Sequence, residues 1–328
     1  MNATLPRLLV LTSTYPRWRD DPEPGFVHQL CKRLVEHFDV VVLAPHAAGS
    51  MTVENMDGVQ IHRYRYAPAR WETLVNAGGI INNLRRYPWK WLLVPTFLLA
   101  QGYATWRLIR QMRPAIVHAH WLIPQGLLTA ILGGVMRNMP PFVVTSHGAD
   151  LYALGGPVAG KFKRYVSRKC AALTVVSNAM LAEAEHQALE APRIQVLPMG
   201  VDMQVRFILD EGQARLDDEL LFVGRLVAKK GLRHLLDAMP YVIERRPSVS
   251  LTIAGFGPEE GALREQVRRM GIDTHVSFIG AVPQPALPEL YRRAALFVAP
   301  FVRDTTGDQE GLPVALMEAI ACGCPVIV

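Results

Sequence analysis

The sequence contains few cysteines, and their spacing excludes two kinds of site. The four are Cys31, Cys170, Cys322 and Cys324. The last two are separated by a single residue, which is not the spacing of a zinc knuckle or of a redox dithiol. We expect all four to be small buried hydrophobic residues of a protein in the reducing cytoplasm.

A hydrophobic run long enough to span a membrane is also missing. The longest run, residues 91–106, is interrupted by Pro95, Gln101 and Gly102, whereas a spanning helix needs about 20 apolar residues. The first strand-like run, residues 8–12, is not preceded by the basic flank, apolar stretch and cleavage site of a secretory signal. We therefore expect a soluble, cytoplasmic chain.

The flanks of the same run are typical of a helix that lies in a membrane interface. Cationic residues stand on both sides of it and tryptophans interleave with them: Arg85, Arg86, Lys90, Arg107, Arg110 and Arg113, with Trp89, Trp91 and Trp106. A buried helix with solvated ends would have the same composition. The sequence leaves both readings open, and the first predicts peripheral attachment to anionic lipids.

Motifs of several other function classes are absent or incomplete. No Gly-x-Ser-x-Gly elbow of a hydrolase occurs, and Gly255-Phe256-Gly257-Pro258 lacks the third glycine of a dinucleotide fingerprint. Lys and Arg number 35 against 29 Asp and Glu, and the isoelectric point is near 9.2. The basic residues are scattered and form no nucleic-acid module, so we expect an anionic ligand or membrane surface and no nucleic acid.

Short β-branched runs alternate with helical stretches along all 328 residues, as in parallel sheets wrapped by crossover helices. A polar stretch near residues 198–218 divides them, so we expect one domain over residues 1–203 and another over 204–328. The predicted strands are 8–12, 40–43, 59–63, 115–118, 142–146, 172–176 and 194–197, then 220–223, 250–254, 276–279, 296–299 and 326–328. Predicted helices include 26–37, 91–112, 180–189, 231–245, 259–270 and 313–321. No helix follows the last strand, so we expect the second domain to be incomplete at its C-terminus.

Two carboxylates eight residues apart give the sharpest signal of a ligand site. Glu310 precedes Pro313, which suits the first turn of a helix. Glu318 is the one charged or polar side chain of residues 312–321. A carboxylate on an apolar helix must be paired or hydrogen-bonded, because burying it bare costs several kcal/mol. Together the two suit recognition of sugar hydroxyls, and a structural salt bridge is the alternative for each.

A second signal is the run from Phe222 to Gly231, in which a strand leads into a loop rich in glycine and lysine and then into a helix. Cations and backbone N–H groups at a helix start form an anion site. Arg225 and Lys230 are therefore candidates to hold a diphosphate. A solvated basic loop would have a similar composition.

In the first half, residues that follow strands are candidates for chemistry. Gly25 opens a helix after the first strand, which lets the backbone approach a phosphate, although a simple helix cap is the alternative. His147 and Asp150 follow the strand at residues 142–146. Residues just past the carboxyl ends of strands face the ligand crevice of a doubly wound sheet. His147 and Asp150 are therefore placed for chemistry.

His118 ends the predicted strand at residues 115–118, and His120 follows it in an extended segment. We expect them to point to opposite faces or to splay apart, and the sequence shows no third ligand of metal spacing. No metal site is expected there.

These motifs resemble those of glycosyltransferase family 4, retaining enzymes of the GT-B fold, an α/β fold with two facing Rossmann-like doubly wound domains. The resemblance covers nearly the whole chain and is strongest over residues 220–328. It implies that Glu310 contacts the donor sugar and Glu318 the ribose, as the two ends of the family's E-x7-E element. It also implies a diphosphate site at Arg225 and Lys230. Gly311 and Leu312 complete the expected donor-binding set.

The resemblance further implies that His147 is the active-site histidine near the donor sugar and that Gly25 lies by the phosphates. The sequence departs from the family in two places. Pro24-Gly25 stands where the family often has paired glycines, and family members continue beyond Val328 with further strands and a helix that crosses back to the first domain.

The function implied is transfer of a sugar from a UDP- or GDP-linked donor to an acceptor hydroxyl, with retention of configuration. His147, Glu310, Arg225 and Lys230 form the expected catalytic set. The acceptor, a glycan or lipid-linked precursor of a cell-envelope polysaccharide, is expected in the first domain. No Asp-x-Asp triplet occurs, so we expect no metal and no cofactor other than the nucleotide sugar. A nucleotide-sugar epimerase, a phosphorylase, and an inactive membrane-surface interaction protein remain alternatives.

Overall fold

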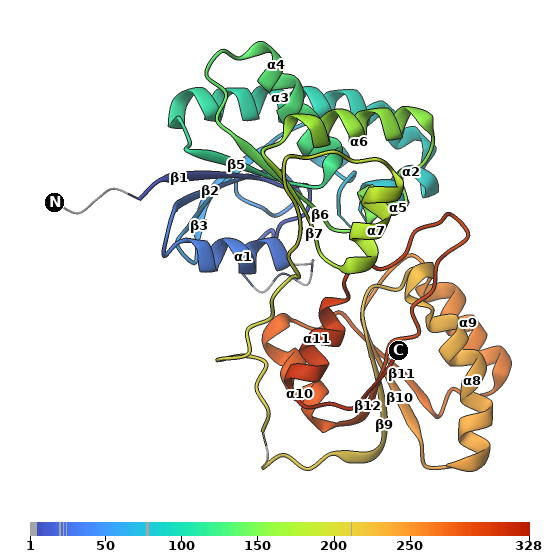
Figure 1. Ribbon diagram of the computed structural model, residues 1–328. Coiled ribbons are helices and arrows are strands. Elements are labelled where there is room, and N and C mark those ends of the chain that lie inside the picture. Colours follow the sequence, from blue (N-terminus) through green and yellow to red (C-terminus); the bar gives the residue numbers. More distant parts are fainter. Residues whose placement is uncertain (1–4, 20, 22, 24, 77–78, 211) are drawn as a thin grey trace. The chain divides into compact units, whose positions relative to one another are not determined.

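The computed structural model describes residues 5–19, 21, 23, 25–76, 79–210 and 212–328. The chain separates into two compact units, residues 1–198 and 199–328, each built on its own sheet (Figure 1). The separation at Pro198–Met199 lies near the domain boundary expected after residue 203. Each unit is described below by itself.

The first unit contains an eight-stranded sheet in the order β3-β4-β2-β1-β5-β6-β7-β8. All neighbours pair in parallel except β3, which is antiparallel to β4. The central strands are apolar on both faces, as expected where helices cover both sides of a parallel sheet. The strands are β1 Arg7–Leu11, β2 Asp39–Pro45, β3 Val53–Met56, β4 Val59–Tyr64, β5 Ile116–His120, β6 Phe142–Ser146, β7 Ala172–Val175 and β8 Ile194–Val196.

Helices cover both faces of this sheet. One layer contains α3, α4 and α6, and α1 lies on the opposite face (Figure 1). The helices of the unit are α1 Phe26–Leu34, α2 Ile80–Arg86, α3 Leu93–Met112, α4 Leu127–Val135, α5 Ala149–Tyr152, α6 Pro157–Lys169 and α7 Asn178–His186.

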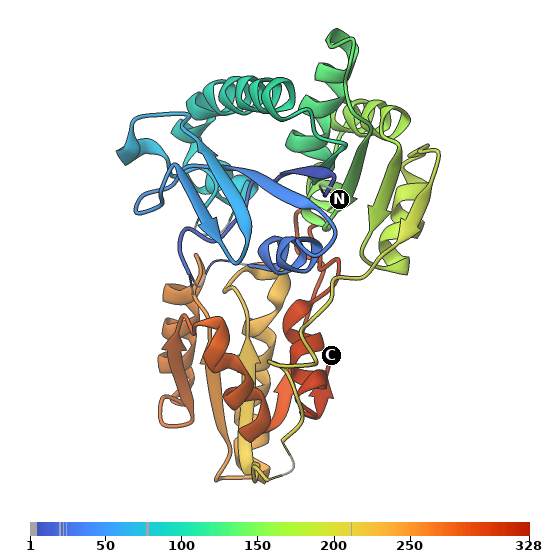
Figure 2. The same cartoon turned by 90° about the vertical axis from the view of Figure 1, so that its left-hand side faces the viewer.

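The second unit contains a five-stranded sheet, entirely parallel, in the order β11-β10-β9-β12-β13. Helices α8 and α9 cover one face of it and α10 and α11 the other (Figure 2). Side chains alternate between the two faces along β9, so that Phe222 packs under α8 and Leu221 under α10. The elements are β9 Leu216–Val223, α8 Leu232–Arg245, β10 Ser250–Ala254, α9 Glu260–Met270, β11 Val276–Gly280, α10 Leu287–Arg293, β12 Ala294–Val298, α11 Val314–Ala321 and β13 Val326–Ile327.

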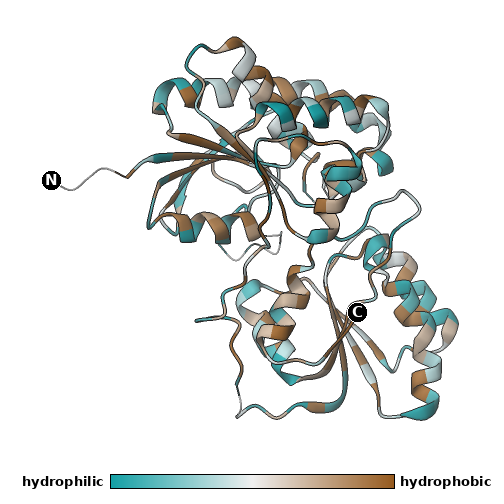
Figure 3. Cartoon of the chain, in the orientation of Figure 1, coloured by the Kyte–Doolittle hydropathy of each residue, from teal (hydrophilic) through white to brown (hydrophobic). Residues whose placement is uncertain are grey.

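The hydropathy of the chain follows this layering. Apolar residues concentrate in the strands and on the helix faces that pack on them, and hydrophilic residues on the outer faces of helices such as α8 and α9 (Figure 3). All four cysteines are buried and free, as expected. In the described residues, no helix combines the length and the apolar character that crossing a membrane requires.

The predicted elements did not include β3, α2, α4, α5, α6 or α10. β3 is a short, largely polar strand at the sheet edge, so it lacks a buried face that would reveal it. In the proline-rich residues 283–288, a short turn at Gln284–Ala286 leads directly into α10. Pro288 lies in the first turn of that helix, where a missing N–H removes no hydrogen bond.

Candidate donor-binding site and the histidine cluster

The order of strands in the second unit defines where a ligand site is expected. From β9 the chain proceeds to β10 and β11 on one side, then returns to β12 and β13 on the other. The direction therefore reverses between β9 and β12. In open parallel sheets, ligands bind at such a reversal, outside the carboxyl ends of the strands. The loops after β9 and β12 carry Arg225, Lys230 and Glu310.

Gly231 allows these two loops to pack against each other. It has a left-handed backbone with φ +67°, and a Cβ added to it would lie 1.6 Å from the carbonyl oxygen of Pro300. Next to it, the N–H of Val302 donates to the carbonyl of Lys229 at 3.0 Å. A side chain at Gly231 would separate the loops, so this glycine sets the distance between the lysines and the loop after β12.

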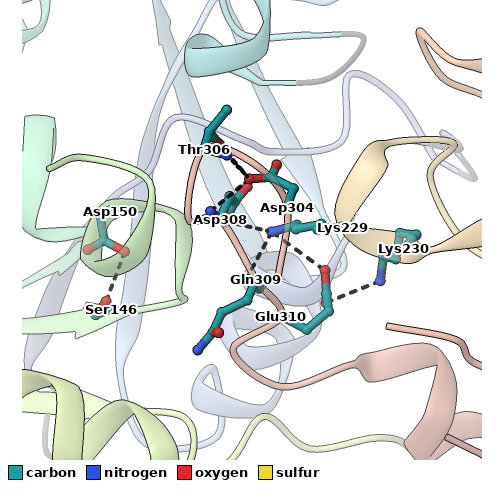
Figure 4. A network of polar contacts seen from close by, with 9 residues as sticks. All are labelled: Ser146, Asp150, Lys229, Lys230, Asp304, Thr306, Asp308, Gln309 and Glu310. Carbon is teal, nitrogen blue, oxygen red and sulfur yellow. Dashed lines mark hydrogen bonds and ion pairs between the residues drawn. The ribbon is translucent and has the colours of Figure 1, made fainter. Parts of the chain in front are cut away.

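Two lysines meet one carboxylate in this space (Figure 4). The Nζ of Lys230 lies 3.1 Å from Oε2 of Glu310, and the Nζ of Lys229 lies 3.5 Å from Oε1. Lys229 also reaches Asp308 Oδ1 at 3.3 Å. The Nζ of Lys230 lies over the ring of Phe301, 4.8 Å from its centroid. The four charged side chains are largely buried, so their interactions are screened less than those of surface pairs.

The electrostatic balance at Glu310 favours the ionised carboxylate. Burial alone would raise the pKa of Glu310, but Lys230 and Lys229 outweigh it and hold that pKa below its ordinary value. Burial lowers the pKa of Lys230, and Glu310 partly offsets this effect. Arg225 lies close enough to act on the charges of both. Three cations thus gather around Glu310, which is the charge distribution that a diphosphate requires.

A turn organised by Asp304 positions Asp308 and Glu310 next to the two lysines. Asp304 Oδ1 accepts hydrogen bonds from the N–H of Thr306 at 2.8 Å and of Asp308 at 3.0 Å (Figure 4). The N–H of Asp304 in turn donates to the carbonyl of Asp308 at 2.9 Å. Aspartate commonly organises such turns through its side chain. Asp304, Asp308 and Lys229 were not among the predicted site residues, although an Asp-x-Thr-x-Asp pattern between strand and helix is a turn signal.

Glu318 lies on α11 in a separate polar contact. Its Oε2 accepts from the hydroxyl of Tyr291 at 2.8 Å and its Oε1 from the amide of Gln284 at 2.9 Å. The expected hydrogen bonding of this buried carboxylate is therefore present, through neutral partners. Burial raises the pKa of Glu318 above its ordinary value. Its expected contact with a ribose stays a prediction.

Gly311 and Leu312 form the half-buried link between Glu310 and α11, which begins at Val314 with Pro313 as its N-cap. The helix thus starts one residue later than expected. Their expected part in donor binding is untested.

The incomplete glycine motif after β10 has a structural role. A Cβ at Gly255 would lie 1.9 Å from the carbonyl oxygen of Gly224, and one at Gly257 would lie 2.4 Å from that of Leu226. The N–H of Leu226 donates to the carbonyl of Phe256 at 3.0 Å. These glycines allow the loop after β10 to support the loop that carries Arg225. This explains the motif without a dinucleotide.

In the first unit, the strand order reverses between β1 and β5, and His147 follows the next strand, β6. Its Nε2 lies 2.8 Å from Nδ1 of His120, and the two rings stack with centroids 5.1 Å apart. Phe26 and Trp121 also contact the ring of His147. Burial lowers the pKa of His147 to about 3, so this imidazole is neutral at physiological pH.

The expectation that the side chains of His118 and His120 point to opposite faces or splay apart was wrong. Their rings lie side by side with centroids 4.3 Å apart, because residues two apart on a strand share one face of the sheet. Nε2 of His118 lies 2.7 Å from Oγ1 of Thr145, and burial lowers the pKa of His118 to about 4. Together with His147 they form a row of three neutral histidines, hereafter the histidine cluster.

The hydrogen bond between His120 and His147 indicates which nitrogen of His147 carries the proton. If His147 donated from Nε2, His120 would carry its own proton on Nε2, which is buried and has no hydrogen-bond partner among the described residues. An orphaned buried N–H is rarer and costlier than an orphaned acceptor. We infer that His120 donates from Nδ1, which leaves His147 with its proton on Nδ1.

Asp150 takes part in hydrogen bonds within the first unit. Both carboxylate oxygens of Asp150 are engaged, one by the hydroxyl of Ser146 at 2.8 Å (Figure 4) and one by the N–H of Leu122 at 2.7 Å. Asp150 thus fixes the turn after β6.

Gly25 is the N-cap of α1, and a Cβ there would meet the side chain of Pro16 at an ordinary 3.6 Å. Pro24 lies outside the described residues, and the expected place of Gly25 beside phosphates remains a prediction.

Throughout the described ranges, no group of three or more His, Cys, Asp or Glu side chains is arranged to hold a metal ion. The expectation that the reaction needs no metal is a separate matter and stays a prediction.

Comparison with known proteins places these features in a family. The sequence profile described as "Glycosyltransferase Family 4" matches residues 26–205, and that described as "Glycosyl transferases group 1" matches residues 210–328. The chain is 30% identical over 210 residues to the GDP-mannose-dependent alpha-(1-6)-phosphatidylinositol monomannoside mannosyltransferase of Mycolicibacterium smegmatis. That match covers 60% of this chain and 55% of the relative, so the chain aligns with about half of that protein.

Two further similarities span almost the whole chain. The putative teichuronic acid biosynthesis glycosyltransferase TuaC of Bacillus subtilis is 26% identical, over 98% of this chain and 80% of that protein. The structure of sucrose-phosphate synthase from Thermosynechococcus elongatus superposes with a TM-score of 0.74 at 16% identity, covering 98% of this chain and 80% of that one. This likeness confirms the expected GT-B fold. The chain belongs to glycosyltransferase family 4.

Proposed function

We propose that this chain is a glycosyltransferase that moves a sugar from a UDP- or GDP-linked donor to an acceptor hydroxyl. The observation that carries the proposal is the cluster of Lys229, Lys230 and Arg225 around Glu310 at the strand-order reversal of the second sheet. Membership of glycosyltransferase family 4 supports it.

The leaving group of such a reaction is a nucleoside diphosphate, on which negative charge develops. Lys230 has three N–H donors, and one of them points to Glu310, so others remain for phosphate oxygens. Arg225 supplies further donors in a fixed fork. Each well-aimed donor stabilises a developing oxyanion by about 2.7 to 4 kcal/mol. In this proposal the cations neutralise the leaving diphosphate without a metal or another cofactor.

Glu310 would bind the donor sugar. An ionised carboxylate accepts about four hydrogen bonds, so Glu310 can hold sugar hydroxyls while it pairs with the lysines. Gly311 and Leu312 follow it and would line the same site. Glu318 would accept a hydrogen bond from the ribose in addition to those from Tyr291 and Gln284.

We propose retention of configuration, with the acceptor attacking the face from which the diphosphate departs and the diphosphate assisting proton removal. His147 would orient or stabilise the sugar through its Nδ1–H. Its neutral state at physiological pH fits a hydrogen-bond donor better than a general acid.

The acceptor would be a glycan or a lipid-linked precursor of a cell-envelope polysaccharide, bound by the first unit. The names of the two relatives, which include phosphatidylinositol monomannoside and teichuronic acid, favour this class. Such an acceptor agrees with a location in the cytoplasm or at the cytoplasmic face of a membrane.

The test is release of nucleoside diphosphate from a panel of UDP- and GDP-sugars, with and without candidate acceptors. The proposal predicts release that depends on acceptor and is unaffected by inorganic phosphate, and loss of release in Glu310→Gln. Interconversion of donor sugars without release would identify an epimerase, and a requirement for phosphate a phosphorylase. No binding of any nucleoside diphosphate in calorimetric titration would favour an inactive interaction protein.

A further inference from the structure

The charges of this chain are strongly segregated. Residues 79–170, all of them described, contain 12 of the 35 Lys and Arg but one of the 29 Asp and Glu. The exception, Asp150, is buried and hydrogen-bonded to Ser146 and Leu122. The other residues carry 23 basic against 28 acidic side chains. The excess positive charge of the protein therefore comes from one continuous segment of the first unit.

Helices α3, α4 and α6 of this segment form the layer that covers one face of the first sheet. In it, α4 lies between α3 and α6 (Figure 1). Ten of the twelve Lys and Arg side chains of residues 79–170 are exposed or half-buried, and two, Lys90 and Lys163, are buried. Arg168 on α6 pairs with Glu190 at the edge of the layer. The outer side of these helices is thus a cationic surface.

The same surface exposes large apolar side chains. Leu92 is 79% exposed, Leu99 on α3 is 73% exposed and Val135 on α4 is 75% exposed. Aromatic residues accompany them: Trp89, Trp91, Tyr103, Phe162 and Tyr165. Cations lie next to several aromatic rings. For example, the guanidinium carbon of Arg110 lies 5.2 Å from the centroid of the Trp106 ring. We call the exposed side of residues 85–92, α3, α4 and α6 the outer helical face.

Buried contacts hold one corner of this face in place. The Nζ of Lys90 donates to the carbonyl of Thr73 at 2.8 Å and to Oδ1 of Asn83 at 2.7 Å. The amide of Asn83 donates in turn to the carbonyl of Leu74 at 3.1 Å. Lys90 therefore points inward while its neighbours Trp89 and Trp91 face solvent. The aromatic corner is presented by a fixed backbone, so little ordering is needed when it binds.

We propose that the outer helical face docks on the surface of a bilayer that contains anionic phospholipids. Its cations complement anionic headgroups, and aromatic rings lie favourably at the depth of the headgroups. Leu92, Leu99 and Val135 would enter the boundary of the acyl chains. A nucleic acid would satisfy the cations but would leave these aliphatic side chains in water, so the exposed aliphatic residues favour lipid.

The experiment is co-sedimentation of the chain with vesicles of phosphatidylcholine alone and of phosphatidylcholine mixed with phosphatidylglycerol in equal parts. We expect binding to the mixed vesicles, weaker binding as salt is raised, and little binding to phosphatidylcholine. Arg85→Gln and Arg86→Gln should each weaken binding about fivefold at low salt, since a cation near an anionic surface contributes about 1 kcal/mol.

A pair of tyrosines provides a matched control. Tyr103 on α3 is 62% exposed and Tyr241 on α8 of the second unit is 66% exposed. Tyr103→Glu should weaken vesicle binding about tenfold, through lost apolar area and headgroup repulsion, and Tyr241→Glu should leave it unchanged. Equal effects of the two, or no vesicle binding at low salt, would overturn the proposal. So would retardation of single-stranded RNA without vesicle binding, which would make the face a nucleic-acid site.

Vesicle binding is independent of the proposed sugar transfer. Glu310→Gln, which should abolish transfer, should sediment with mixed vesicles as the unmodified chain does. The proposed function and the docking surface can therefore fail separately.

Discussion

Replacing Lys230 by methionine removes one ammonium group from the cationic cluster and keeps a side chain of similar length. In the structure this ammonium lies 3.1 Å from Glu310 and above the ring of Phe301. Lys229 remains 3.5 Å from the same carboxylate and Arg225 remains near it, so Glu310 keeps two of its three neighbouring cations. The variant should therefore fold. Without Lys230, fewer cations oppose the effect of burial, so the pKa of Glu310 should rise.

The expected loss is mainly in the chemical step. If Lys230 stabilises the departing diphosphate, its removal should lower kcat by about 100- to 1,000-fold, which is about 2.7 to 4 kcal/mol. The effect on KM should be smaller, because the charge on the leaving group develops in the transition state. Lys229→Met should lower kcat less, since Lys229 is also engaged by Asp308 and the carbonyl of Gln309.

The assay is the steady-state rate of nucleoside diphosphate release with a saturating acceptor, together with calorimetric titration of UDP and GDP. Circular dichroism and urea unfolding establish that each variant is folded. The reasoning would be refuted if folded Lys230→Met retained the rate of the unmodified chain, or if Lys229→Met were the more damaging of the two.

Three further predictions concern other residues. His120→Gln should lower kcat about fivefold, the value of one orienting hydrogen bond, and leave KM for the donor unchanged. In ¹⁵N-histidine spectra of the unmodified chain, His147 should show the Nδ1–H form. An Nε2–H signal from His147 would contradict the inferred proton position. Gly231→Ala should reduce the free energy of unfolding by more than about 2 kcal/mol. The control is Gly271→Ala, at φ +66° with no atom near its added Cβ, which should reduce that free energy by about 1 to 2 kcal/mol. Equal reductions in urea unfolding would exclude the clash with Pro300. The stability contributed by Glu310 should be present above its ordinary pKa of 4.5 and be lost as pH falls through its lower folded pKa; Glu318, with a raised pKa, should contribute stability below 4.5 that is lost as pH rises through its folded value. The free energy of unfolding in urea should be measured for Glu310→Gln and Glu318→Gln at pH values above and below 4.5. As pH rises, the loss of stability relative to the unmodified chain should grow for Glu310→Gln and shrink for Glu318→Gln. The same pH dependence in both variants would contradict the opposite pKa shifts.

The sequence predicted the elements that form the centre of each sheet, because buried parallel strands read as apolar runs. β1, β2, β6 and β10 differ from their predicted ranges by no more than a few residues. It did not reveal α6, whose buried residues are Lys163, Val166 and Ser167 and so do not form an apolar row. Nor did it reveal β3, which lies at the edge of the described sheet and pairs with β4.

The sequence also predicted the charged residues of the second unit better than their partners. Glu310 and Lys230 could be singled out because a charge beside an apolar helix or a glycine-rich loop is unusual. The contacts of Lys229, Asp304 and Asp308 depend on how two loops distant in sequence meet at Gly231, which no local pattern specifies. The histidine cluster was missed because the side-chain direction along β5 was misjudged.

The most direct test of the central claim is a crystal structure of the chain with UDP or GDP bound. We predict that the diphosphate lies within hydrogen-bond distance of Lys230 Nζ and of the Arg225 guanidinium, beyond the carboxyl ends of β9 and β12, and that Glu310 faces the outer phosphate. A nucleoside diphosphate bound elsewhere in the chain, with the pair of Lys230 and Glu310 untouched, would contradict it.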